Sequence, residues 1–145
     1  MVGRLRQNDT CTFCAIVAGT ESADRVYETE ETLAFLPLAP ATIGHTLIVS
    51  KAHVSDLWHA DMGTLTPIME AAIKVADALK KAFNPDGLNL INSAGAAATQ
   101  TVFHIHFHLV PRWGGDRMGD FWPSDERLPS GERARVAEEI KRNIS

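Results

Sequence analysis

The sequence predicts a single α+β domain in which an antiparallel sheet carries helices on one face. Three observations lead to this prediction. Most apolar runs are short, rich in β-branched residues and separated by turn residues, which is the pattern of strands. One long segment, residues 61–83, instead repeats its apolar residues at helical spacing, and a second helical pattern ends the chain. The length of 145 residues suits one domain with a proper hydrophobic core.

The strand candidates follow one another along the chain. Residues 26–28 and 32–36 flank an acidic turn and are expected to form a hairpin. Residues 45–50 form an apolar, β-branched run, which is a good strand pattern. Residues 88–91 and 101–110 complete the set. Because consecutive strands are joined by short turns, we expect antiparallel pairing.

Two segments have the apolar spacing of helices. The first carries one apolar stripe, formed by Ile68, Ala72, Val75, Ala76, Leu79 and Phe83. Because proline is tolerated only in the first turn, Pro67 predicts either a helix start at Thr66 or a kink at this point. Asn84-Pro-Asp-Gly87 ends this helix. Ser130 is expected to cap a last helix, which runs to about Asn143 with three apolar residues inward: Val136, Ala137 and Ile140.

The composition narrows the class of protein. A net charge of -4 provides no basic surface for duplex nucleic acid. No apolar run approaches the length of a membrane span, and the first residues lack the apolar centre of a signal peptide. We therefore expect a cytoplasmic protein that binds neither duplex nucleic acid nor a membrane.

Three of the six histidines occupy alternate positions in TVFHIHFHLVPR, residues 101–112. On a strand, His104, His106 and His108 would share one face, with neighbours about 6.6–6.8 Å apart. The opposite face would be core, formed by Thr101, Phe103, Ile105, Phe107 and Leu109. A single histidine on a strand is usually inert and hydrogen-bonded, whereas a cluster of titratable groups is typical of a site. Two functional interpretations remain open: a metal site, or proton and nucleophile chemistry on a substrate.

Cys11 and Cys14 form a Cys-x-x-Cys pair. Two cysteines are too few for a disulfide framework. By itself the spacing suits a redox pair or two buried thiols, and it does not discriminate between these interpretations.

The segment His-Ile-His-Phe-His-Leu-Val, residues 104–110, resembles the signature of the histidine triad (HIT) family of nucleotide-binding hydrolases and transferases. The similarity covers roughly residues 11–123 and keeps the family's order of motifs: Cys-Thr-Phe-Cys-Ala-Ile-Val at 11–17, Leu-Ala-Phe at 33–35, Gly-His-Thr-Leu-Ile-Val-Ser-Lys-Ala-His at 44–53 and Gly-Leu-Asn-Leu-Ile-Asn at 87–92. Pro111-Arg112 and the following Gly-Gly-Asp are typical of bacterial HIT proteins and of the dinucleoside-polyphosphate hydrolase branch.

The resemblance implies an α+β fold with a five-stranded antiparallel sheet, one long helix and a C-terminal helix, in a homodimer. A flexible segment, residues 1–10, would precede a single HIT domain, residues 11–145. The helix at 66–83 and the strand at 88–91 would form the subunit contact, because they leave a sheet edge and an apolar stripe to be covered.

The resemblance also implies roles for the triad. His106 is the expected nucleophile toward the α-phosphorus of a nucleotide, with its other ring nitrogen donating to a backbone carbonyl. His108 is expected beside the phosphate and the leaving group, where a donor imidazole offsets developing charge. His104 would support the pair from behind. Gln100 and Thr101 would place donors next to the phosphate.

Further nucleotide contacts are implied by the same comparison. The base would lie among four apolar side chains: Phe13, Ile16, Phe35 and Leu38. Asn92 matches a ribose or phosphate contact, and the small residues at 94–98 would let backbone N–H groups approach an anion. Many relatives hold the ribose hydroxyls with an acidic residue where this chain has Leu36-Pro37, so no ribose contact is assigned there.

In some relatives a Cys-x-x-Cys pair binds zinc together with two histidines. By this resemblance, the corresponding residues would form a complete tetrahedral shell for structural Zn²⁺: Cys11, Cys14, His53 and His104. Such a site would use the first triad histidine and leave His106 and His108 for phosphate. His45 is expected to be a hydrogen-bonded neighbour of the triad, and His59 a surface residue.

The leading hypothesis is an enzyme that cleaves a nucleoside phosphoramidate or a dinucleoside polyphosphate at the α-phosphorus and releases a nucleoside monophosphate. The alternative is a nucleotide-binding sensor or scaffold with little catalysis. Loss of the middle histidine would favour that alternative, and His106 is present. Nucleotidyl transfer to a sugar phosphate is disfavoured, because such relatives are larger and replace the third histidine.

Overall fold

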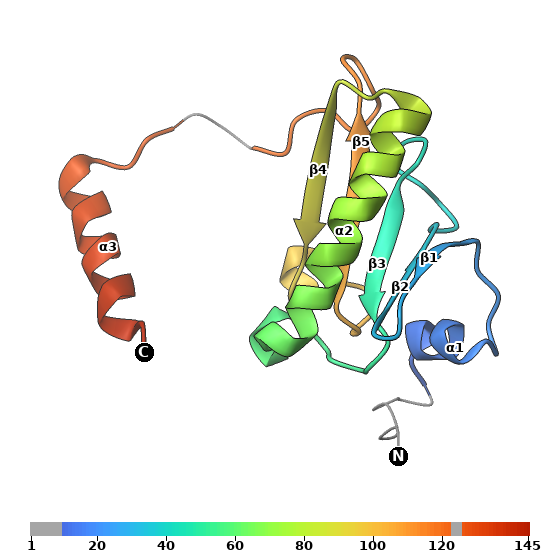
Figure 1. Ribbon diagram of the computed structural model, residues 1–145. Coiled ribbons are helices and arrows are strands. Elements are labelled where there is room, and N and C mark those ends of the chain that lie inside the picture. The colour runs from blue at the N-terminus through green and yellow to red at the C-terminus, as the bar shows by residue number, and fades with distance from the viewer. Residues whose placement is uncertain (1–9, 123–125) are drawn as a thin grey trace.

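The computed structural model describes residues 10–122 and 126–145, so the predicted flexible segment at 1–10 lies outside the described residues except for its last position. The elements follow in the order α1 (Thr12–Ala18), β1 (Arg25–Glu28), β2 (Thr32–Phe35), β3 (Thr46–Ser50), η1 (Leu57–His59), α2 (Met62–Phe83), β4 (Gly87–Asn92), η2 (Ala96–Ala98), β5 (His106–Arg112) and α3 (Ser130–Asn143) (Figure 1).

The five strands form one sheet in the order β1-β2-β3-β5-β4, and each pair of neighbours is antiparallel. This confirms the predicted five-stranded α+β architecture. The register places Arg25, Phe35, Leu47 and His108 in one row across four strands. Side chains in such a row share a face of the sheet. His108 therefore lies on the same face of the sheet as Phe35 of β2 and Leu47 of β3.

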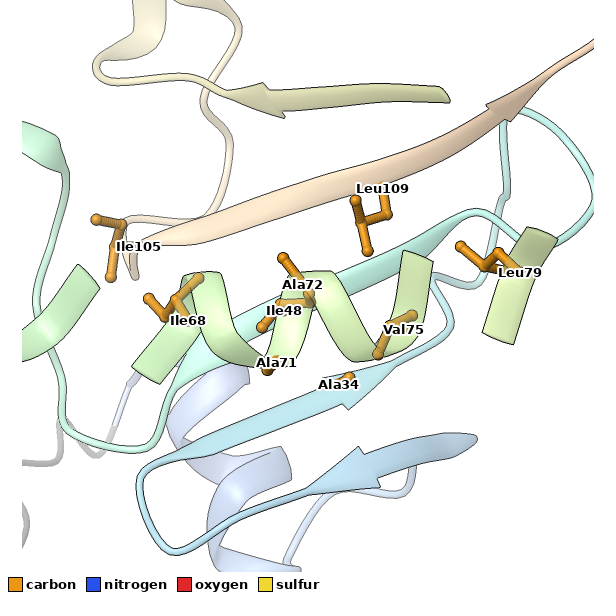
Figure 2. Close-up of a cluster of buried hydrophobic side chains, with 9 residues drawn as sticks. All are labelled: Ala34, Ile48, Ile68, Ala71, Ala72, Val75, Leu79, Ile105 and Leu109. Atoms are coloured by element: carbon orange, nitrogen blue, oxygen red, sulfur yellow. The ribbon is translucent and has the colours of Figure 1, made fainter. Parts of the chain in front are cut away.

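Helix α2 covers the other face of the sheet. The main core between them is drawn in Figure 2 and consists of Ala34, Ile48, Ile68, Ala71, Ala72, Val75, Leu79, Ile105 and Leu109. The helix begins at Met62, one turn before the predicted start at Thr66, because the side chain of Asp61 accepts a hydrogen bond from the backbone N–H of Thr64 at 2.9 Å. Pro67 lies in the second turn, where it removes one backbone donor, and α2 continues through it.

The short helix α1 packs on the face opposite α2, so the expectation of helices on one face only is wrong. Its apolar residues belong to a second core cluster, formed by Phe13, Ile16, Leu33, Phe35, Leu47 and Val49. The helix starts where the thiol of Cys11 accepts a hydrogen bond from the backbone N–H of Cys14, and it ends at Gly19, whose φ of 80° suits glycine. Seven residues are too few for a clear periodic signal, which is why the sequence pattern does not reveal this helix.

Strand β5 is shorter at its N-terminal end than predicted. The expected strand at 101–110 begins only at His106. The preceding residues form a bend, in which the backbone N–H of Ile105 donates to the carbonyl of Val54 at 2.6 Å, outside the sheet. Phe103, expected in the core, is 49% exposed because the bend breaks the period-two alternation.

Helix α3 has the predicted extent but neither the predicted cap nor the predicted packing. The N-cap position is Pro129, and no side-chain hydrogen bond caps the helix, so Ser130 does not act as its cap. Val136, Ala137 and Ile140, expected to face inward, are all exposed. Figure 1 shows that α3 lies apart from the sheet, so among the described residues it has no core to pack against. Neither α3 nor any other helix in the described parts of the chain is long and apolar enough to cross a membrane.

Candidate active site

A cleft of about 530 Å³ opens on the α1 side of the sheet. Its lining comes from α1 and the loop after it, from the end of β2 and the following loop, and from β3 and β5. The structure brings together seven of the residues assigned from the sequence: Phe13, Ile16, Phe35, Leu38, Thr101, His106 and His108. A partly apolar cleft of this volume, with a few polar groups converging on it, is typical of a small-molecule site.

His106 lies on β5, lines the cleft and is 8% exposed. Its Nδ1 lies 2.7 Å from the carbonyl oxygen of His104. A carbonyl can only accept a hydrogen bond, so Nδ1 carries the proton and Nε2 of the neutral ring is unprotonated. Burial lowers the pKa of His106, which favours the neutral ring at pH 7. The ring of Phe13 meets the imidazole edge to face, with 5.1 Å between centroids, and restricts its rotation.

His108 is held in the opposite tautomer by two successive hydrogen bonds. The backbone N–H of Ala41 donates to Nδ1 of His45 at 2.9 Å, so the ring proton of His45 is on Nε2. That Nε2 lies 2.9 Å from Nδ1 of His108, which must accept, so the proton of neutral His108 is on its own Nε2. Burial, with smaller effects of the neighbouring imidazoles, lowers the pKa of His108 to about 4. His108 is therefore a neutral donor at pH 7.

Two thiols and two imidazoles converge beside the cleft. The ligand atoms of Cys11, Cys14, His53 and His104 all lie within 4.8 Å of one another. Nδ1 of His104 lies 3.4 Å and 3.5 Å from the two sulfur atoms, and Nδ1 of His53 lies 3.3 Å from Sγ of Cys14. Tetrahedral zinc with ordinary bond lengths places sulfur and nitrogen ligands about 3.6 Å apart, so the donor set fits zinc.

The orientation of His104 agrees with this fit. Its Nε2 lies 2.7 Å from the backbone carbonyl of Ser50, so that nitrogen carries the proton and Nδ1 presents its lone pair to the thiols. A metal-binding histidine commonly has a carbonyl partner on its other nitrogen. Burial lowers the pKa of His104 to about 4, which keeps the ring neutral, as a metal ligand must be.

Asn92 and Gln100 do not line the cleft. The side chain of Asn92 donates to the carbonyl of His106 at 2.9 Å and so supports the backbone of β5 from β4. The amide of Gln100 is buried, accepts from the N–H of Gly95 and donates to two backbone carbonyls. These bonds hold the loop at 94–98 in shape, and this loop is not part of the cleft lining either.

Three polar residues that line the cleft were not singled out by any sequence pattern: Glu21, Ser22 and Asp24. They belong to the loop between α1 and β1, which has neither a motif nor a period. Only the pairing of β1 with β2 brings this loop to the cleft.

The HIT domain family matches residues 18–115 of the chain. Protein hit of Bacillus subtilis is 40% identical over 115 residues, which cover 79% of each chain. Among solved structures, a Zn-bound histidine triad family protein from Mycobacterium smegmatis is 39% identical, with a TM-score of 0.72 over 92% of this chain and 98% of that one. A histidine triad nucleotide-binding protein from Candida albicans is 30% identical, with a TM-score of 0.81 over 92% of this chain and 96% of that one. Together with the histidines of β5, these matches show that the chain belongs to the HIT family.

Proposed function

We propose that this protein is a hydrolase that cleaves a nucleotide at its α-phosphorus, through a nucleotidyl intermediate on His106, and releases a nucleoside monophosphate. The observation that supports this most directly is a pair of neutral imidazoles in opposite tautomers. His106 has an unprotonated Nε2, His108 has a proton on Nε2, and the ring centroids are 5.0 Å apart. The likeness to a histidine triad nucleotide-binding protein supports a nucleotide as the ligand.

The two ends of a nucleotide match different parts of the cleft. Side chains of α1 and of the segment at 35–38 supply apolar surface for the base, as assigned above: Phe13, Ile16, Phe35 and Leu38. The imidazoles of His106 and His108 supply polar contacts for the phosphate, and the exposed Thr101 lies at the same cleft. A base in the apolar part therefore places the α-phosphate toward β5.

In the proposed reaction, Nε2 of His106 forms a bond to the α-phosphorus while the bond from phosphorus to the leaving group breaks. The Nε2–H group of His108 donates a hydrogen bond to the negative charge that develops on the leaving group or on the phosphate. A phosphate leaving group departs as an anion, and an amine takes up a proton from water. Water then attacks the phosphorus, the bond to His106 breaks, and the proton that water loses goes to solvent. Each cycle consumes one water and restores both imidazoles.

We also propose that Cys11, Cys14, His53 and His104 bind a structural Zn²⁺ ion. The donor distances support this, as does the likeness to a Zn-bound protein of the family. When bound, the ion would tie the start of α1 to the segments before η1 and before β5. His106 and His108 take no part in this set and stay available for the phosphate.

We further propose a homodimer that forms through α2 and β4. Strand β4 is an edge strand, and its Leu88 and Leu90 are 41% and 48% exposed. Leu90 pairs with Leu109, so these leucines lie on the α2 side of the sheet. On α2, Ile73 is 72% exposed. An open sheet edge beside exposed apolar side chains is the kind of surface that a second copy covers.

The hydrolase proposal is tested by incubating the purified protein with adenosine phosphoramidate, adenylyl sulfate and diadenosine tetraphosphate, and resolving the products. Release of AMP from at least one substrate, lost in the His106→Ala variant, is expected. Tight binding of AMP without turnover of any substrate would instead favour the nucleotide sensor or scaffold.

A further inference from the structure

The cleft has two chemically different ends. The imidazoles of His106 and His108 stand at one end, and the carboxylates of Glu21 and Asp24 line the other. Apolar residues of β2 and β3, Phe35 and Leu47, form the floor between them. A ligand that fills the cleft therefore meets nitrogen groups suited to an anion at one end and hydrogen-bond acceptors at the other.

The position of Asp24 relative to the histidines follows from the strand register. Asp24 immediately precedes Arg25, which starts the row of paired residues that ends at His108. Its carbonyl also accepts a hydrogen bond from the backbone N–H of Leu36 at 3.0 Å, which holds the residue against the end of β2. Three strand spacings separate the two ends of the row, about 14 Å. Asp24 thus lies across the apolar floor from the phosphate end.

The carboxylate of Asp24 is available to a ligand. Within the described residues, neither Asp24 nor Glu21 has a side-chain hydrogen bond or an ion pair. The neighbouring cations are engaged elsewhere: Arg25 donates to the carbonyl of Ile16 and pairs with Glu28, and Lys51 pairs with Glu28 as well. A carboxylate without a cation repels phosphate, and its oxygens only accept hydrogen bonds. Asp24 therefore suits a ligand group that carries O–H or N–H donors.

We propose that Asp24 is a specificity-determining residue that accepts hydrogen bonds from the 2′- and 3′-hydroxyls of a ribonucleotide. This inference rests on the proposed binding of a nucleotide in the cleft. With the base against the apolar residues of α1 and the phosphate at β5, the sugar that joins them lies over the floor. Asp24 lines the cleft and is exposed, so its carboxylate is accessible to the hydroxyls of this sugar. The protein thereby distinguishes ribonucleotides from nucleotides that lack these hydroxyls.

Binding measurements test this inference independently of turnover. The dissociation constants of AMP and of 2′,3′-dideoxy-AMP are measured by calorimetry for the parent protein and for Asp24→Asn. The parent is expected to prefer AMP roughly 10- to 100-fold, the range for hydrogen bonds to a charged group, and Asp24→Asn is expected to lose most of this preference. Asp77→Asn, a change on the exposed side of α2, serves as the matched control and should keep the preference of the parent.

Four results would overturn the inference. An unchanged preference in Asp24→Asn removes the role of this carboxylate while leaving the proposed function intact. Loss of the preference in Glu21→Gln but not in Asp24→Asn would assign the ribose contact to Glu21 instead of Asp24. A third probe, purine riboside 5′-monophosphate, lacks the exocyclic amine of AMP. If Asp24→Asn changes only the preference for AMP over this probe, Asp24 contacts the base and not the ribose. Failure of the parent to bind any of the nucleotides would contradict the proposed function as well.

Discussion

Nε2 of His45 lies 2.9 Å from Nδ1 of His108, although the two residues are 63 positions apart in the chain. His45 is 8% exposed, and burial lowers its pKa, so it remains a neutral donor at pH 7. The contact determines which nitrogen of His108 carries the proton. It therefore links a histidine outside the triad to the charge-stabilising role that we propose for His108.

Replacing His45 with alanine is expected to lower kcat for adenosine phosphoramidate roughly 10- to 100-fold, taking as a guide the effect of removing a partner that orients a metal-bound histidine. His108→Ala should cost more, roughly 10²- to 10⁴-fold. Because His45 acts through His108, the double variant should be no slower than His108→Ala alone. His59→Ala is the control, since that side chain is 70% exposed and outside the cleft. If the fold losses in kcat of the two single variants multiply in the double variant, His45 acts independently of His108.

His106→Ala is expected to abolish turnover while nucleotide affinity stays nearly unchanged, because the nucleophile contributes mainly in the transition state. Mass spectrometry of the parent protein, quenched during turnover, should find a nucleotide adduct on the peptide that contains His106. Turnover by His106→Ala at near the parent rate would show that another group attacks the phosphorus.

Protein purified without added metal or chelator is expected to contain about one zinc ion per chain, as for a complete Cys₂His₂ shell. Cys14→Ser should lower both the zinc content and the melting temperature, because the ion would connect three separate segments. The nucleophile should stay chemically intact, so the adduct on His106 should still form when Cys14→Ser is assayed below its melting temperature. A zinc content near zero in the parent, measured by elemental analysis, would leave Cys11 and Cys14 as buried thiols.

The free energy of unfolding is expected to fall as the pH drops from about 6.5 toward 4. The pKa of His108 is about 4 in the folded protein, against a reference value of 6.5, so between these pH values the unfolded chain binds more protons. One pKa unit corresponds to about 1.4 kcal/mol, so His108 alone contributes at most about 3 kcal/mol to this loss. Denaturant melts of the parent and of His108→Gln at pH 7 and pH 5 test this, and an equal loss in both proteins would contradict it.

Leu90→Asp is expected to convert the proposed dimer to monomers, because it places a charge in the apolar contact between the β4 edges. Light scattering at micromolar concentration measures the outcome. Leu57→Asp is the matched control: both leucines are 48% exposed, but Leu57 lies on η1, outside the proposed contact. A parent protein that is already monomeric, or equal dissociation in both variants, would contradict the proposed interface.

The features that depend on near neighbours in the chain were predictable from the sequence. The β-branched runs became strands and the stripe of α2 became the face of the main core, because side-chain direction repeats with the period of each element. The αL conformation of Asn84, with φ 44°, ends α2 at the predicted point. The alternation of His106 and His108 also survives, since both lie on a regular strand.

Only the tertiary structure decided how distant segments meet. His104 lies in the bend before β5, and its ring contacts thiols 90 and 93 positions away. The tautomer of His108 depends on His45, and Asp24 reaches the cleft only through the pairing of β1 with β2. The apolar residues of α3 were expected to face a core, but they are exposed, and α3 lies apart from the sheet. Periodicity specifies which face of an element is apolar, but the partner of that face is set by the path of the whole chain. The polar groups of the site take their protonation states from contacts made only after folding.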